Sequence, residues 1–190
     1  MKTLLATAAV MALAASMPAA AQQRPLSDPV VAAPNPEALF TSKDAKLNRN
    51  KQATLHIMKE LLQCHQWNRA GEWLTDKYIQ HNPVAKSGLA GVVYYFTQVA
   101  KQQPTPTCDK LTSPVVAVQA EGDYVTVSTV RTLPIPGTTT GETYTTTWFD
   151  MYRFVDGKAD EHWDPMALGA GPGPSASASK PAASGSGTAE

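Results

Sequence analysis

The stretch WFDMYRFVDGKADEHWDPM, residues 148–166, carries the plainest structural signal in the chain. Aromatic, apolar and charged residues alternate on both sides of Asp156-Gly157. An Asp-Gly pair between two alternating runs is typical of a two-residue β-hairpin turn. The pattern therefore predicts two antiparallel strands, residues 143–155 and 159–166.

The turn also predicts which side chains share a face of the hairpin. Strict pairing from Val155 and Lys158 outward sets Asp150 opposite Trp163, and residues that oppose one another share a face. The face with most aromatic residues, which we expect to line the core and a pocket, holds Asp150, Tyr152, Phe154, Ala159, Glu161 and Trp163. The other face holds Met151, Arg153, Asp160 and His162, with Arg153 and Asp160 as an exposed ion pair.

The rest of the folded region divides into helical and strand-like parts. Residues 51–67, 72–78 and 87–101 show apolar residues at helical spacing, whereas 115–118 and 124–130 are rich in β-branched residues. Helices followed by an antiparallel meander predict an α+β domain. We expect three N-terminal helices packed on a strongly curved antiparallel sheet.

Composition marks the two ends of the domain. Residues 1–21 combine Lys2, an apolar Ala-rich run and three alanines ending at Ala21, which is typical of a signal peptide. Residues 22–41 contain four prolines and predict an extended arm, and the Gly/Ala/Ser/Pro tail 169–190 predicts disorder. We therefore expect one domain at 42–168, periplasmic or secreted after cleavage near Ala21, and no membrane anchor.

Charge and motifs exclude several functional classes. The chain has 16 basic and 16 acidic residues and no basic run, which argues against nucleic-acid binding. Phosphate-binding glycine loops, nucleophile elbows and zinc-ligand spacings are missing from the sequence. A metal site built from His81, His162 and a carboxylate is an alternative without ligand spacing to support it. We expect neither a metal nor an organic cofactor.

Cys64 and Cys108 are the only cysteines. In an oxidising compartment an even number of cysteines is compatible with a disulfide. The alternative is a pair of separate, unbonded core residues, and the sequence leaves both interpretations open.

Several motifs together resemble one family. The sequence YIQHNP at 78–83, the Phe-Asp-x-x-Arg strand, the Asp-Gly-Lys turn and the Glu-His-Trp-Asp strand resemble the SnoaL-like polyketide cyclases of the nuclear-transport-factor-two-like superfamily. The resemblance covers about residues 50–166. It implies a cone-shaped domain, a largely apolar pocket for a small molecule, and a homodimer formed through the outer face of the sheet.

The resemblance also implies two catalytic positions. Asp164 matches the acid/base aspartate of the cyclases. Asp150 stands where the cyclases have histidine and where ketosteroid isomerase-like relatives have an aspartic acid that hydrogen-bonds the oxyanion. Strict hairpin pairing sets the two on opposite faces, so a bulge between Glu161 and Pro165, or a bend, is required to bring both to the pocket. The alternative is that Asp164 only caps or pairs at the strand end.

The remaining candidate pocket residues are His81, Tyr152, Glu161, Trp163 and Tyr95. His81 either donates a hydrogen bond at the pocket edge or ties down the loop before Pro83. We expect the two aspartates to lie near Trp163 and His81, with one of them protonated near neutral pH. The predicted function is a cofactor-free exported enzyme that moves a proton next to a carbonyl, as an isomerase, aldol-type cyclase or dehydratase. The alternative is a non-catalytic module that binds a ligand or a protein.

Overall fold

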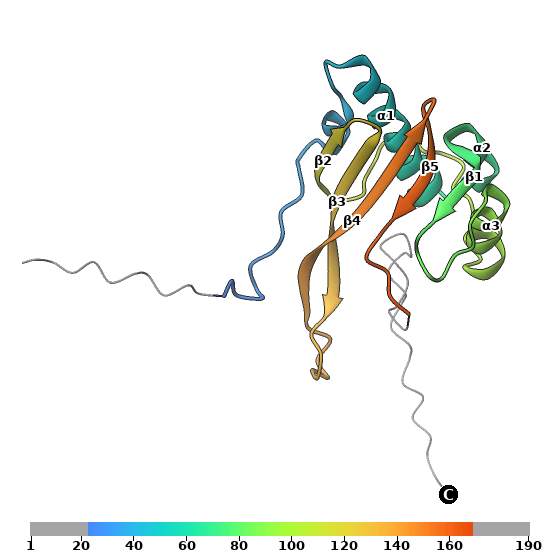
Figure 1. Ribbon diagram of the computed structural model, residues 1–190. Helices are drawn as coiled ribbons and strands as arrows, with labels where there is room; N and C mark the ends of the chain where they lie inside the picture. Colours follow the sequence, from blue (N-terminus) through green and yellow to red (C-terminus); the bar gives the residue numbers. More distant parts are fainter. Residues whose placement is uncertain (1–22, 169–190) are drawn as a thin grey trace, which may run out of the picture.

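A computed structural model describes residues 23–168 (Figure 1). The predicted signal peptide and C-terminal tail lie outside the described residues. The elements, in chain order, are a 3₁₀ turn Pro36–Phe40, α1 Ala45–His56 with a π-helical continuation Ile57–Gln63, a 3₁₀ turn Trp67–Arg69, α2 Ala70–Trp73, β1 Leu74–Gln80, α3 Leu89–Tyr94 with a π-helical continuation Tyr95–Val99, β2 Val115–Glu121, β3 Tyr124–Pro134, β4 Thr143–Val155 and β5 Lys158–Trp163.

The strands form one open sheet in the order β1-β5-β4-β3-β2. Helical residues such as Ile57 and Leu61 pack with Val125, Tyr152 and Phe154 of the sheet in one buried cluster. The predicted α+β arrangement of helices on one face of a curved sheet is confirmed (Figure 1). Within 23–168 no helix has the length and apolar character needed to cross a bilayer.

The sheet differs from the prediction at one edge, where β1 pairs in parallel with β5. The expected helix at 72–78 is wrong, because α2 ends at Trp73 and the chain continues as a strand. Leu74 and Tyr78 are its buried residues. Their spacing of four fits one face of a helix and, as a multiple of two, also one face of a strand. Hydrogen bonding to β5 selects the strand conformation for this segment.

The N-terminal arm is not extended throughout. Pro36–Phe40 forms a 3₁₀ turn, and Phe40 is fully buried against Leu111 and Val115. Upstream, the backbone N–H of Ala33 donates to the carbonyl of Val115 at 2.8 Å. The packed core therefore begins at Phe40, before the expected boundary at residue 42.

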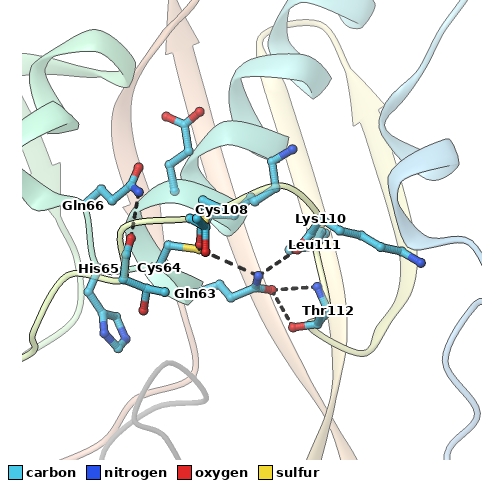
Figure 2. Close-up of a disulfide and its surroundings, with 12 residues drawn as sticks. Gln63, Cys64, His65, Gln66, Cys108, Lys110, Leu111 and Thr112 are labelled. Atoms are coloured by element: carbon cyan, nitrogen blue, oxygen red, sulfur yellow. Dashed lines mark hydrogen bonds between the residues drawn. A yellow bond between two sulfur atoms is a disulfide. The ribbon is translucent and has the colours of Figure 1, made fainter.

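A disulfide joins Cys64, at the end of the first helix, to Cys108 in the loop before β2, with a Cα–Cα distance of 6.0 Å (Figure 2). Gln63 clamps the same loop: its Nε2 donates to the carbonyl of Lys110 at 2.9 Å, and its Oε1 accepts from the N–H of Thr112 at 2.7 Å. The segment after α3 is thus held against the end of the first helix.

Candidate functional site

The turn that starts β5 has the predicted geometry. Asp156 and Gly157 both have positive φ, 49° and 83°. This is the conformation that a two-residue type I′ turn requires. Val155 pairs with Lys158, and Phe154 with Ala159, as expected.

A bulge then interrupts the pairing at Asp160. Arg153 pairs with Glu161, and Tyr152 with His162. The bulge lies one residue before the expected interval, and because side chains alternate along a strand, every later residue of β5 faces the opposite way from the prediction. His162 therefore points to the core, where it is 6% exposed, and Glu161 and Trp163 leave the pocket face.

The predicted pocket roles of His81, Glu161 and Trp163 are wrong. The ring of His81 stacks on Trp163 with centroids 4.5 Å apart, and its Nε2 lies 2.9 Å from Oε2 of Glu161. Arg153 bridges Glu161 and Asp160 on this outer face, which extends the predicted Arg153–Asp160 pair. The hydrogen bond from His81 and the nearby Arg153 outweigh desolvation and hold the pKa of Glu161 below its ordinary value. These residues stabilise the bulge and do not reach the cavity.

The inner face brings together Asp150 from β4, His162 from β5 and Asp164 just beyond β5. Nε2 of His162 lies 3.0 Å from Oδ1 of Asp150, and Nδ1 lies 3.9 Å from Oδ2 of Asp164. All three side chains are less than 10% exposed, at 8%, 8% and 7%. Both predicted catalytic aspartates thus lie beside a histidine that the sequence assigned to the opposite face.

Neighbouring groups hold this cluster in place. Asp164 accepts hydrogen bonds from Nδ2 of Asn82 and from the N–H of Met166, each at 2.8 Å. Nδ1 of His162 lies 2.7 Å from Oε1 of Gln80. Asn82 and Gln80 flank His81 in the YIQHNP motif. The motif therefore supplies the site through Gln80 and Asn82, the two neighbours of His81, and not through His81 itself.

A cavity of about 300 Å³ opens beside the cluster. Its helical wall is mostly apolar, and the two π-helical continuations both contribute to it, with Leu61 from the first and Tyr95 and Phe96 from the second. Asp150, Asp164 and Tyr152 line the sheet side. π-Helical turns occur frequently at functional sites. The cavity has the size and lining of a small-molecule pocket.

Two tyrosines flank the histidine on the cavity wall. The ring of Tyr152 stacks on His162 with centroids 4.7 Å apart, and the ring of Tyr78 lies 6.5 Å from it. Burial, and then the charge of Asp150, raise the pKa of both phenols well above 10. Both therefore stay protonated and can donate a hydrogen bond.

The cluster contains the residue types that ligate cations. Asp150, His162 and Asp164 each offer one ligand atom, and these atoms lie within 4.8 Å of one another. The alternative site of His81 with His162 is excluded, because the two rings lie on opposite faces of the sheet. Each ring nitrogen of His162 already faces an acceptor oxygen, on Asp150 or Gln80. A ring with its proton on Nδ1 donates to Gln80 and leaves Nε2 able to accept a proton from Asp150, so the geometry suits proton transfer.

The comparison with protein families matches residues 58–162, more than half of the chain, to the SnoaL-like domain. The protein belongs to the SnoaL-like family. A comparison with curated proteins found no match.

Solved structures of SnoaL-like proteins are similar at low identity. A proposed polyketide cyclase from Acidithiobacillus ferrooxidans is 18% identical, with a TM-score of 0.44 over 65% of this chain and 89% of that one. A proposed SnoaL-like polyketide cyclase from Jannaschia sp. CCS1 is 19% identical, with a TM-score of 0.44 over 66% and 91%. TerC, co-crystallised with polyporic acid, is 15% identical, with a TM-score of 0.44 over 63% and 92%.

Proposed function

We propose that this SnoaL-like protein is an enzyme that moves a proton next to a carbonyl group of an apolar small molecule. The reaction classes are isomerisation, aldol-type cyclisation and dehydration. The observation that carries the proposal is the buried cluster of Asp150, His162 and Asp164 in the wall of a largely apolar cavity. Burying two carboxylates costs several kcal/mol of folding free energy, which an apolar core would avoid. Their placement favours a chemical role.

The cluster supplies the groups that such a reaction needs. A carboxylate removes the proton beside the carbonyl, and the bond electrons move onto the carbonyl oxygen as an enolate forms. Asp150 uses Oδ1 for both His162 and Trp148, and its other oxygen, Oδ2, takes part in neither contact. His162 lies between the two aspartates. A proton taken up at Asp150 can pass through the imidazole towards Asp164 once the 3.9 Å gap closes.

The same proposal includes export. Residues 1–21 have the order of a signal peptide, and the disulfide between Cys64 and Cys108 suits an oxidising compartment such as the periplasm. We infer that the enzyme works outside the cytoplasm, after cleavage near Ala21.

The test is deuterium exchange into aromatic ketones, with 2-tetralone first because its α-protons are acidic. The wild-type protein should speed exchange above the buffer rate. Asp150→Asn and Asp164→Asn keep the side-chain volume but remove the base, so each should lower the rate by about 100-fold or more. Asp156→Asn is the matched control: Asp156 is exposed in the hairpin turn, where asparagine tolerates the positive φ.

Each variant is first shown to be folded by its thermal unfolding midpoint. Two outcomes would favour the non-catalytic binding module. One is exchange at the full rate in both Asp150→Asn and Asp164→Asn. The other is no exchange above the buffer rate by the wild type with any aromatic ketone tested.

A further inference from the structure

One long loop borders the cavity without a helix or strand of its own. It runs from residue 100, after the second π-helical continuation, to residue 114, before β2. Both ends of the loop line the cavity, with Ala100 and Gln102 at its start and Ser113 and Pro114 at its end. Loops of this length without secondary structure are uncommon in compact domains and often serve as lids over binding sites. The loop is therefore placed to control access to the cavity.

A covalent bond ties the middle of this loop to a wall of the cavity. Cys108 lies in the loop and is joined to Cys64, which directly follows Gln63 at the end of the first π-helical continuation (Figure 2). Gln63 itself lines the cavity. Hydrogen bonds hold the loop on either side of the bridge, at Thr105 and at Lys110. The disulfide thus fastens the loop between two sets of weaker contacts.

The backbone is strained at two places where this loop meets the helical segments. His65, directly after Cys64, has a φ of 57°, and Lys101, at the start of the loop, has a φ of 52°. Helices often end with a residue in this left-handed conformation, but the usual residue is glycine, because a Cβ is crowded there. Strain of this kind is characteristic of ligand clamps and switch regions. Opening of the loop would release it.

Two polar contacts close the loop over the cavity near its start. Nε1 of Trp67 donates to Oε1 of Gln102 at 2.8 Å, and Nδ1 of His65 lies 3.1 Å from the carbonyl oxygen of Gln103. Trp67 and His65 both line the cavity. Single hydrogen bonds that exchange with water add little net stability. A loop held by such bonds alone can open repeatedly, whereas a loop tied by a covalent bond cannot move far.

We propose that the loop 100–114 is a lid on the cavity and that the disulfide between Cys64 and Cys108 is its redox latch. With the bond formed, the lid stays against the helical wall, and a ligand enters and leaves slowly. With the bond reduced, the lid opens more often, and ligand exchange becomes faster. The inference goes beyond the proposed function, because it concerns access to the cavity and holds for an enzyme and for a binding module alike.

Reduction of the latch requires a dithiol as the second reactant. A thiolate of the dithiol attacks Sγ of Cys108, which is more exposed than Cys64, and Cys64 leaves as a thiolate. The second thiol of the reagent then displaces Cys108 from the mixed disulfide. The protein gains two electrons and two protons, and the dithiol becomes a disulfide.

The probe is N-phenyl-1-naphthylamine, a neutral apolar dye whose fluorescence rises in apolar surroundings. Stopped-flow mixing gives its association and dissociation rate constants for the oxidised wild type, the wild type reduced with dithiothreitol, and the variant Cys64→Ala/Cys108→Ala. Both rate constants should rise by about tenfold or more in the reduced protein and in the variant, because an unlatched loop regains chain entropy when it opens. The Kd should change by less than about threefold, since the lid governs entry and exit rather than the bound state.

Two controls separate the latch from a general loss of stability. Glu60→Gln removes an ionised hydrogen-bond partner in the same helical segment, but Glu60 lies outside the cavity lining and outside the loop. It should lower the stability of the fold and leave both rate constants unchanged. Reoxidation should restore the slow rates in the wild type, and dithiothreitol should have no effect on the double variant.

Hydrogen exchange followed by mass spectrometry gives a second readout. Reduction should speed amide exchange in residues 100–114 and leave the amides of the β3–β4 pair at their oxidised rate. Four results would overturn the latch: rate constants that do not change on reduction, an equal rise in Glu60→Gln, no binding of the dye by either form, or faster exchange over all segments alike. The dye kinetics need no reaction, so a failure of ketone exchange would refute the proposed function and leave the latch standing.

Discussion

Replacing Cys64 and Cys108 together by alanine should lower the free energy of unfolding by about 4 kcal/mol. The bridge closes a loop with a sequence separation of 44 residues. In the chain-entropy model, −2.1 − 1.5R ln n gives about −13 cal/mol/K for this loop, or about 4 kcal/mol at 25 °C. The effect arises because the unfolded chain gains the conformations that the bridge forbids.

The native state should survive the change, because other contacts hold the same loop. The N–H of Thr105 donates to the carbonyl of Cys64 at 2.8 Å, and Nε2 of Gln66 donates to the carbonyl of Thr105 at 2.9 Å. Nε2 of Gln63 would lose its 3.9 Å contact with Sγ of Cys64 but keep its hydrogen bond to the carbonyl of Lys110 (Figure 2).

The assay is equilibrium unfolding in urea, followed by tryptophan fluorescence, on the oxidised protein, the reduced protein and the double-alanine variant. The urea midpoint should fall in the reduced protein and in the double-alanine variant. The slope m should rise in both, because an unbridged unfolded chain exposes more surface. Reductant should have no effect on the double variant. A loss below about 1 kcal/mol with unchanged m would refute the loop-entropy argument.

Two further predictions concern acid stability and processing. Burial raises the pKa of Glu60, but hydrogen bonds from His56 and Trp73 outweigh it and leave the pKa below the ordinary 4.5. The carboxylate therefore stabilises the protein above pH 4.5, and this contribution is lost as pH falls through the lower folded pKa. Glu60→Gln should lower the free energy of unfolding by about 1–3 kcal/mol at neutral pH. In thermal melts, the difference in unfolding midpoint between the variant and the wild type should close as the pH becomes acidic. A difference that stays constant with pH would contradict this prediction. Protein recovered from the periplasm should have the mass of a chain starting at Gln22, and the full-length mass would count against export.

Local signals in the sequence determined the turn, the strands beside it and the fold class. Asp156-Gly157 adopts the positive φ values that its residue types favour, and the order of helical and alternating patterns predicted the α+β layers correctly. These features depend on neighbours in the chain, so the sequence alone contains them. The YIQHNP motif and the strand motifs were likewise sufficient to indicate the SnoaL-like family.

Which residues form the site depends instead on long-range contacts that the local sequence pattern does not contain. The bulge at Asp160 depends on contacts that are distant in sequence, since Thr75 of β1 donates to Oδ1 of Asp160 at 2.7 Å and Arg153 pairs with both Asp160 and Glu161. Side chains alternate along a strand with a period of two, so one extra residue exchanged the two faces of β5. That exchange brought His162 to the cavity and moved Glu161 away from it, because the long-range contacts of Asp160, and not the local pattern, set the register.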